Sequence, residues 1–350
     1  MMQLLTRCCV PLNTRTRRIQ DEIVEGDNLI KIIQLAKHSQ KTKKFVKERH
    51  WDFIAIEAKY GLNGRDSVFV KFKGKHFEFV LVETMERKSN GMIKGGLNQR
   101  DRYICDYLVY NPSGGTRQLI LYLMNLFSIP HLEAIKFMDP QRDIRDFCNF
   151  NGIYKASRVF IGKENMTKAE LDYIKDTFTY IDLMCFHTEP PKAYELWPMN
   201  YRLVSLANKV KLSWRHLKEM GCQNLDLRRA NLSGMQLHNY IRYWLATDEP
   251  SNLESIFIRK FARYQHRHVL KGLPVFPWNP NSRSRFYKFF LDFSWDCSKG
   301  FDIIRRDGLL ATIGCMENHC VFLVWKERFH EIPENFECYD AWTVKSFSMY

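Results

Sequence analysis

The sequence lacks the long apolar run that a membrane-spanning helix requires. A helix that crosses a bilayer needs about 20 consecutive apolar residues, and no stretch of this 350-residue chain approaches that length. The opening residues, Met1 to Arg7, hold an apolar stretch that is too short and too interrupted for the core of a secretory signal. We therefore expect a cytoplasmic or nuclear protein without a membrane partner.

Cysteines at metal-binding spacing are also missing. The 10 cysteines are spread from Cys8 to Cys338 without a CxxC pair, and the closest late pair is Cys315 and Cys320. Zinc requires clustered ligands, and a disulfide framework requires an oxidising compartment. We therefore expect reduced, mostly buried thiols that pack as small hydrophobic side chains, and we expect no metal and no cofactor.

Motifs of the common enzyme classes are absent as well. The sequence holds no P-loop, HExxH, GxSxG or GxGxxG motif and no kinase motif set. The stretch from Asn111 to Thr116 resembles a phosphate loop only superficially, because the Lys-Ser/Thr ending is missing. His266 and His268 have no acidic or thiol residue close by in the sequence, so they are typical of exposed polar histidines. We expect a protein that is not an enzyme.

Positive charge is plentiful, with a formal net charge of +14. It is spread over most of the chain, and its densest cluster lies between Lys41 and Arg49. A basic nucleic-acid-binding protein is therefore an alternative, for which the aromatic and basic stretch from Arg283 to Phe290 could supply a stacking platform. An alternation of buried and exposed positions produces the same stretch, and we regard a nucleic-acid partner as the less favoured interpretation.

The first third of the chain changes pattern twice. Apolar residues at three- and four-residue spacings predict short helices over residues 10–48. Short β-rich runs follow over residues 51–82, with Asn63-Gly64 and Lys73-Gly74 at the positions of hairpin turns, which predicts an antiparallel meander. Residues 83–116 combine five glycines with many charges and are predicted to be a linker or loop.

A repeat pattern is recognisable from about residue 117 onward. Expected strands centred on Ile135, Val159 and Leu183 are 24 residues apart, and a fourth near Val210 follows after 27, with helical stretches between them. Strand–helix units of about 20–29 residues are typical of leucine-rich repeats, which build a core only by stacking. An ordinary α/β domain with evenly spaced strands is the alternative.

The C-terminal part carries a strong hairpin signal. Asp307-Gly308 separates two apolar runs, and a third run covers Cys320 to Trp325. Such a meander could cap the open end of a repeat stack, which otherwise exposes a sheet edge. The expected fold class is α+β, with residues 1–48 as a short helical segment, 49–116 as β-meander and Gly-rich linker, and 117–350 as irregular leucine-rich-repeat-like units closed by an antiparallel hairpin block.

Two blocks resemble nematode F-box proteins that carry an F-box-associated domain of the second type. The first runs from Val10-Pro11-Leu12 to Val46 and ends with the Ser, Lys and Thr residues of 39–44. The second covers residues 210–254, including Leu225-Asp226-Leu227 and Trp244, and the Phe301–Trp325 block looks like that family's C-terminal part. Val10 stands where the family has Leu, and Gly26-Asp27-Asn28 replaces a Pro-containing turn, so the F-box is partly degenerate.

This resemblance implies a non-catalytic substrate receptor of an SCF-type ubiquitin ligase. The F-box would dock on the adaptor subunit of the ligase, and the C-terminal domain would hold an unknown target protein. Amphipathic helices bind such grooves through apolar anchors, and the candidate anchors for the adaptor are Val10, Pro11, Ile19, Ile23, Ile32 and Leu35. A ligase-independent interaction protein whose F-box has decayed is the alternative. The residues that bind the target stay unassigned.

Overall fold

The computed structural model is an α+β protein that divides into two compact units, residues 1–157 and 158–350. Each unit is described by itself. The residues that the structure describes are 29–49, 51, 55–61, 65–83, 93–99, 102–109, 112–148, 156–163, 166–178, 181–187, 201–207, 211–228, 232–247, 252–288, 294–316 and 318–326. Among these residues, no helix has the length and apolar character to cross a membrane.

Unit 1 is built on a mixed sheet with the strand order β6-β1-β2-β3-β5-β4. The predicted meander is confirmed in β1 (Ala55–Tyr60), β2 (Ser67–Phe72) and β3 (Lys75–Glu83), which pair antiparallel in sequence. The turn at Lys73-Gly74 has positive φ angles of 46° and 77°, as a tight hairpin requires. Asn63-Gly64 lies outside the described residues. Strand β6 (Leu132–Phe137) joins the other edge of β1 in parallel.

The Gly-rich stretch that was predicted to be a linker forms two strands instead. β5 (Arg102–Val109) pairs parallel with β3, and β4 (Ile93–Gln99) pairs antiparallel with β5. The register shifts between Lys94 and Leu97, where Gly95 and Gly96 stand. Glycine is tolerated at such an irregularity because it has no side chain to misplace, so these glycines mark a bulge within the sheet.

Helix α4 (Pro112–Phe127) covers β1, β2 and β3. The predicted domain boundary between residues 116 and 117 lies inside this helix, whereas the two compact units divide between Ser157 and Arg158. The boundary lies further along the chain because one side of α4 is buried in unit 1. Its side chains Leu119, Ile120, Leu123 and Leu126 are at most 1% exposed. These side chains belong to the core of unit 1, which closes only after α4.

Two of the predicted N-terminal helices are present, α2 (Leu29–His38) and α3 (Gln40–Glu48). Ser39 begins α3 by accepting a hydrogen bond from the Thr42 amide at 3.0 Å. Trp51 ties the pair to the rest of unit 1, because its Nε1 donates to the Val46 carbonyl at 2.8 Å and its ring contacts Phe72 and Phe127. A short helix, α5 (Ile144–Cys148), follows β6.

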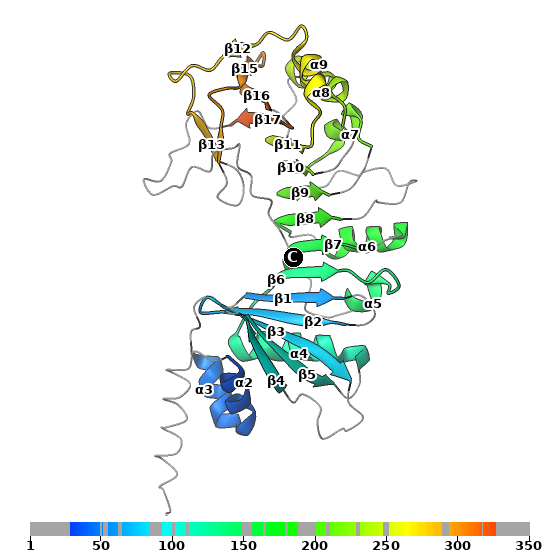
Figure 1. Ribbon diagram of the computed structural model, residues 1–350, viewed down its shortest axis with the longest axis vertical. Coiled ribbons are helices and arrows are strands. Elements are labelled where there is room, and N and C mark those ends of the chain that lie inside the picture. Colours follow the sequence, from blue (N-terminus) through cyan, green and yellow to red (C-terminus); the bar gives the residue numbers. More distant parts are fainter. Residues whose placement is uncertain are drawn as a thin grey trace, which may run out of the picture. The chain divides into compact units, whose positions relative to one another are not determined.

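Unit 2 contains the expected strand–helix stack. The strands β7 (Ala156–Ile161), β8 (Leu183–Phe186), β9 (Leu203–Leu206), β10 (Asn224–Leu227) and β11 (Ser255–Arg259) pair in parallel and in chain order. Figure 1 shows them stacked, with α6 (Lys168–Thr177), α7 (Trp214–Glu219) and α8 (Gly234–Ala246) along one side. The residues in register, Val159, Met184, Val204, Leu225 and Ile256, are 25, 20, 21 and 31 positions apart.

The predicted strand near Val210 falls on a position outside the described residues, and the fourth strand of the stack is β9 at Leu203–Leu206, which was not predicted. All four residues of β9 are buried, as a strand covered on both faces requires. Leu212 is also buried, but it directly precedes Ser213, which begins α7. The described end of the apolar run near Val210, from Lys211, therefore leads into a helix.

Hydroxyl side chains cap two helices of unit 2. Thr167 begins α6 and forms a reciprocal capping box with Glu170, and Ser233 begins α8 by accepting from the Gln236 amide. Each cap satisfies amide groups that the first helical turn leaves unpaired.

The C-terminal meander closes the parallel stack, as predicted. β17 (His319–Trp325) pairs antiparallel with β11, and β16 (Leu310–Met316), β15 (Phe301–Ile304) and β12 (Phe276–Pro277) follow outward. Gly308 has a φ of +88° in the turn between β15 and β16, which confirms the hairpin at Asp307-Gly308. Between β11 and β12 lie η3 (Arg263–Gln265) and α9 (His266–Leu270).

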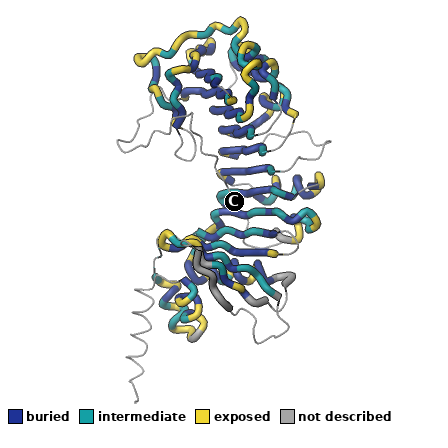
Figure 2. The backbone as a smooth tube through the Cα atoms, in the orientation of Figure 1, coloured by how far each residue is buried: buried dark blue, intermediate teal, exposed yellow. Residues whose placement is uncertain are grey.

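The two faces of this part of the sheet are covered by different elements. Phe322 contacts Tyr240 and Trp244 of α8 on one face. The hairpin of β13 (Phe286–Lys288) and β14 (Ser294–Asp296) covers the other, where Trp295 packs on Phe257. Figure 2 shows β8 to β11 buried along their length, whereas exposed residues gather in the segment that carries β12.

Candidate functional site

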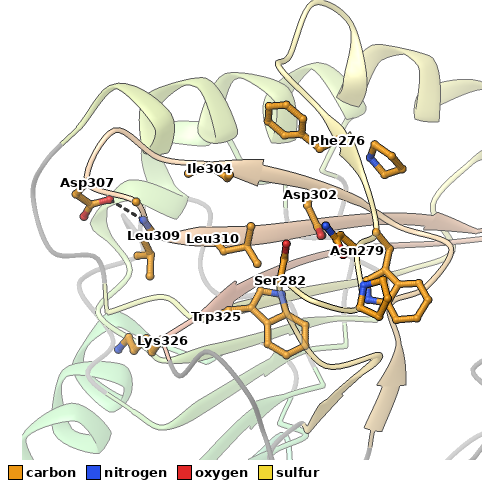
Figure 3. A pocket seen from close by; sticks show the side chains of 14 residues that line it. Phe276, Asn279, Ser282, Asp302, Ile304, Asp307, Leu309, Leu310, Trp325 and Lys326 are labelled. Atoms are coloured by element: carbon orange, nitrogen blue, oxygen red, sulfur yellow. Dashed lines mark hydrogen bonds between the residues drawn. The ribbon is translucent and has the colours of Figure 1, made fainter.

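A groove at the outer end of the unit 2 sheet is the candidate site. Its volume is about 1040 Å³, at the upper end of the range of about 300–1,000 Å³ that is usual for ligand pockets. One wall is the segment from Phe276 to Pro280, and the other is the β15–β16 hairpin with the end of β17 (Figure 3). The site therefore combines a loop segment with a rigid antiparallel hairpin.

Exposed apolar side chains gather at this groove. Large exposed hydrophobic residues are few in the described part of the chain, and three of six, Phe276, Phe301 and Ile304, stand on β12 and β15. Phe276 and Ile304 line the groove and are each 51% exposed. Such a concentration of apolar side chains is typical of an interaction site, whereas single exposed hydrophobic residues are ordinary.

The floor of the groove is held by a buried ion pair. Arg283 is 0% exposed and donates to the carboxylate of Asp302 at 2.7–2.9 Å. Asp302 also accepts from the Thr312 hydroxyl at 2.7 Å, and that hydroxyl in turn accepts from Trp325 Nε1 at 2.9 Å. The Arg283 guanidinium lies 5.1 Å from the centre of a Trp325 ring. This network fixes Asp302 and Trp325, both of which line the groove.

The charges at the rim of the groove are also paired. Asp307 accepts from Arg305 Nε at 3.0 Å and from the Leu309 amide at 3.1 Å. Lys326 lies 2.7 Å from a Glu254 carboxylate oxygen. Because these cations and anions neutralise one another, the groove favours an uncharged ligand segment over a strongly charged one.

The Asp307 carboxyl provides a titration test of this arrangement. The hydrogen bond from Arg305, followed by that from the Leu309 amide, lowers the pKa of Asp307 to about 2. The ionised form therefore supports the hairpin above the ordinary Asp pKa of 3.8, and this support is lost as the pH falls through about 2. A ¹³C NMR titration should give a midpoint near 2, and Arg305→Gln should move it toward 3.8. An unshifted midpoint in the unsubstituted protein would contradict the pairing.

Aromatic rings form part of the groove lining. Trp278 is half-buried and lines the groove next to Phe276 and Pro277. Within the described part of the chain its Nε1 is buried and has no hydrogen-bond partner, so the ring and not the N–H group is what a ligand meets. Aromatic-lined grooves bind extended, proline-containing segments, and this lining suits such a peptide.

A second group of polar residues follows the parallel strands of unit 2. Asp226 on β10 accepts from Arg228, Arg259 and Ser205 at 3.0–3.2 Å. On β8, which β9 separates from β10, Cys185 Sγ lies 3.5 Å from Nε2 of His187, the residue that follows the strand.

Cys185 and His187 do not form an activated nucleophile. Burial raises the pKa of Cys185 to about 11, and burial with the nearby Arg228 lowers the pKa of His187. At neutral pH the thiol is protonated, whereas nucleophilic cysteines require a thiolate. Among the described residues, no group of three or more His, Cys, Asp or Glu side chains could hold a metal ion.

The predicted adaptor anchors are only partly covered by the structure. Val10, Pro11, Ile19 and Ile23 lie outside the described residues. Ile32 is 0% exposed on α2, and Leu35 on the same helix is half-buried. The structure thus places Ile32 in the packing of the helices and leaves Leu35 as the candidate that a partner can reach within the described part of the chain.

The groove residues were missed by sequence reasoning. The stretch Phe276-Pro277-Trp278-Asn279-Pro280 carried a usable signal, because a tryptophan between two prolines cannot be part of a regular helix or of a central strand. The stretch considered as a stacking platform has another role. Arg283 and Tyr287 are buried in the packing of unit 2, whereas Arg285 between them is exposed, so the simple alternation considered for this stretch does not describe it.

Comparisons with known proteins find two distant relatives. Both are uncharacterised proteins of Caenorhabditis elegans. One is 24% identical over 179 residues, which cover 49% of this chain and 41% of the relative. The other is 26% identical over 220 residues, which cover 60% of this chain and 45% of the relative. The matches thus span less than half the length of either relative. No protein-family model matches the chain, and no solved structure matches it significantly.

Proposed function

We propose that this chain is a non-catalytic recognition protein whose unit 2 groove binds an extended apolar segment of a partner protein. The observation that carries the proposal is the concentration of exposed apolar side chains, Phe276 and Ile304 above all, around an ordered floor. The interaction residues stand on paired strands, and the buried Arg283–Asp302 network holds the floor in place. Preorganised sites of this kind lose little conformational entropy on binding.

The chemistry of the groove defines the partner segment. The aromatic rings of Phe276 and Trp278 in its lining match proline and aliphatic side chains. The ionic groups of the rim are already paired within the chain. We therefore expect an extended segment that contains proline and carries no dense charge.

The same proposal includes delivery of the partner to a ubiquitin ligase. Its support is the resemblance of residues 10–46 to an F-box, together with α2 inside that stretch and α3, which begins inside it and ends at Glu48. In this function the N-terminal helices dock on the adaptor subunit of an SCF-type ligase, while unit 2 binds the target. The protein itself catalyses nothing and places one protein next to the ligase.

Affinity purification followed by mass spectrometry tests target binding and adaptor binding with three variants. Ile304→Asp puts a charge into the apolar groove and should lower target recovery at least about tenfold without affecting the adaptor. Leu35→Asp should lower the recovery of the adaptor and leave the recovery of the target unchanged. Met235→Asp is the matched control, because Met235 is 49% exposed on α8 and Ile304 is 51% exposed. This variant should leave the recovery of target and adaptor unchanged.

The outcomes separate the possible functions. Loss of the target with Met235→Asp as well as with Ile304→Asp would refute a specific role of the groove. If the adaptor is never recovered but the target depends on Ile304, the chain is a ligase-independent interaction protein. Recovery of nucleic acid in place of a protein target, abolished by salt, would favour the basic nucleic-acid-binding alternative.

A further inference from the structure

Two cysteines stand directly opposite each other at one end of the β16–β17 hairpin. Cys315 on β16 is in register with Cys320 on β17, and their Sγ atoms are 3.0 Å apart. Directly opposed residues of an antiparallel pair have Cα atoms about 4.5 or 5.5 Å apart. Both values lie within the range of about 4.4–6.8 Å over which a disulfide can form. The backbone therefore already has the geometry of a cross-strand disulfide.

Cys315 also differs in accessibility from the other cysteines whose burial the structure describes. Cys315 is partly exposed, whereas Cys105, Cys185, Cys222 and Cys297 are buried. Cys320 is itself buried, with an exposed fraction of 0%. An oxidant in solution can thus reach one sulfur of the pair, and the second sulfur is protected directly behind it. This is the arrangement of an attacked thiol with a resolving thiol at hand.

We propose that Cys315 and Cys320 form a modification site at which a hydroperoxide converts two thiols to a reversible disulfide. In the first step the Cys315 sulfur attacks the peroxide, which leaves Cys315 as a sulfenic acid and releases one hydroxyl as water or alcohol. In the second step the Cys320 sulfur attacks the Cys315 sulfur, a second water leaves, and the S–S bond forms. The peroxide is reduced by two electrons, and the two thiols are oxidised.

The environment of the two sulfurs supports this order of events. Burial, and then the neighbouring Cys315, raise the pKa of the Cys320 thiol well above its ordinary value. Cys320 is therefore a poor nucleophile toward the peroxide. Its sulfur reacts in the second step, with the sulfenic acid that has formed on Cys315. The site lies outside the groove lining, so it can exist whether or not the groove binds a partner protein.

Oxidation of the purified full-length chain with hydrogen peroxide tests the site. After graded oxidation, free thiols are alkylated under denaturing conditions and the chain is digested for mass spectrometry. We expect Cys315 and Cys320 to lose their alkyl adducts together and the mass of their peptide to fall by two hydrogen atoms. A reducing agent should restore both adducts, and the four buried cysteines should stay alkylated.

Two alanine variants provide the matched comparison. Cys320→Ala and Cys222→Ala each remove a thiol whose residue is 0% exposed. With Cys320→Ala, the Cys315 sulfenic acid should accumulate and react with dimedone, whereas Cys222→Ala should still form the disulfide. The proposal is wrong if both cysteines of the unsubstituted protein stay alkylatable at every peroxide concentration. It is also wrong if Cys315 proceeds to sulfinic acid or links to a second chain without pairing with Cys320.

Discussion

Arg283→Ala should lower the free energy of unfolding by about 3–5 kcal/mol, the largest effect that we expect of a single charged residue in unit 2. The guanidinium is 0% exposed and donates to Asp302, to the Cys297 carbonyl and to the Ser284 carbonyl. Its removal leaves the Asp302 carboxylate, which is 3% exposed, without a counter-charge. For a unit of this size the melting temperature should fall by roughly 6–20 °C.

Arg285→Ala is the matched control for that experiment. Arg285 lies two positions further along the chain and pairs with Asp296 at 2.7 Å, but its side chain is 55% exposed. Exposed ion pairs contribute about 0–1 kcal/mol, so this variant should melt within a few degrees of the unsubstituted protein. Denaturant unfolding monitored by circular dichroism measures both. Equal losses from the two variants would show that burial of the Arg283–Asp302 pair does not determine the stability of the groove.

Trp295→Ala should also destabilise unit 2 by about 3–5 kcal/mol, because it removes a large side chain from a closed core. Trp295 is 1% exposed and packs on Phe257, and with Tyr287 it joins the β13–β14 hairpin to the sheet. Without the indole, a cavity remains between the hairpin and the sheet that neither can fill alone. Thermal unfolding measures the loss.

Trp278→Ala separates stability from recognition. Trp278 lines the groove and is half-buried, so its removal should cost only about 1 kcal/mol of stability. Recovery of the target protein should nevertheless fall, since the variant loses an aromatic side chain of the groove lining. If Trp278→Ala unfolds the chain as strongly as Trp295→Ala does, the side chain belongs to the core and the proposed role of the groove is refuted.

Local sequence signals predicted the elements of the fold that depend on local chemistry. Lys73-Gly74 and Asp307-Gly308 form tight turns because glycine there adopts a positive φ, and Thr167 and Ser233 cap helices through their own hydroxyls. Strand β9 was not predicted, because a run of four buried residues shows no period of its own. The burial of β9 on both faces depends on the elements that pack against it, and these are not visible in its own residues.

The groove depends on contacts that no local pattern contains. Arg283 looked like part of a charged surface, and its partner Asp302 stands 19 positions further along the chain. Exposure of Ile304 and burial of its neighbour Ile303 depend on what packs on each face of β15. A single sequence shows that both are apolar and does not show which one faces solvent.

The parallel strands and the groove lining of unit 2 occupy separate parts of the sequence. Every residue that lines the groove falls between Phe276 and Lys326, after the last parallel strand, while β8, β9 and β10 recur at intervals of 20 and 21 residues. Duplication or deletion of one such interval would lengthen or shorten the stack and leave the groove intact. The number of stacked strands and the residues of the groove can therefore vary independently, because they occupy separate segments of the sequence.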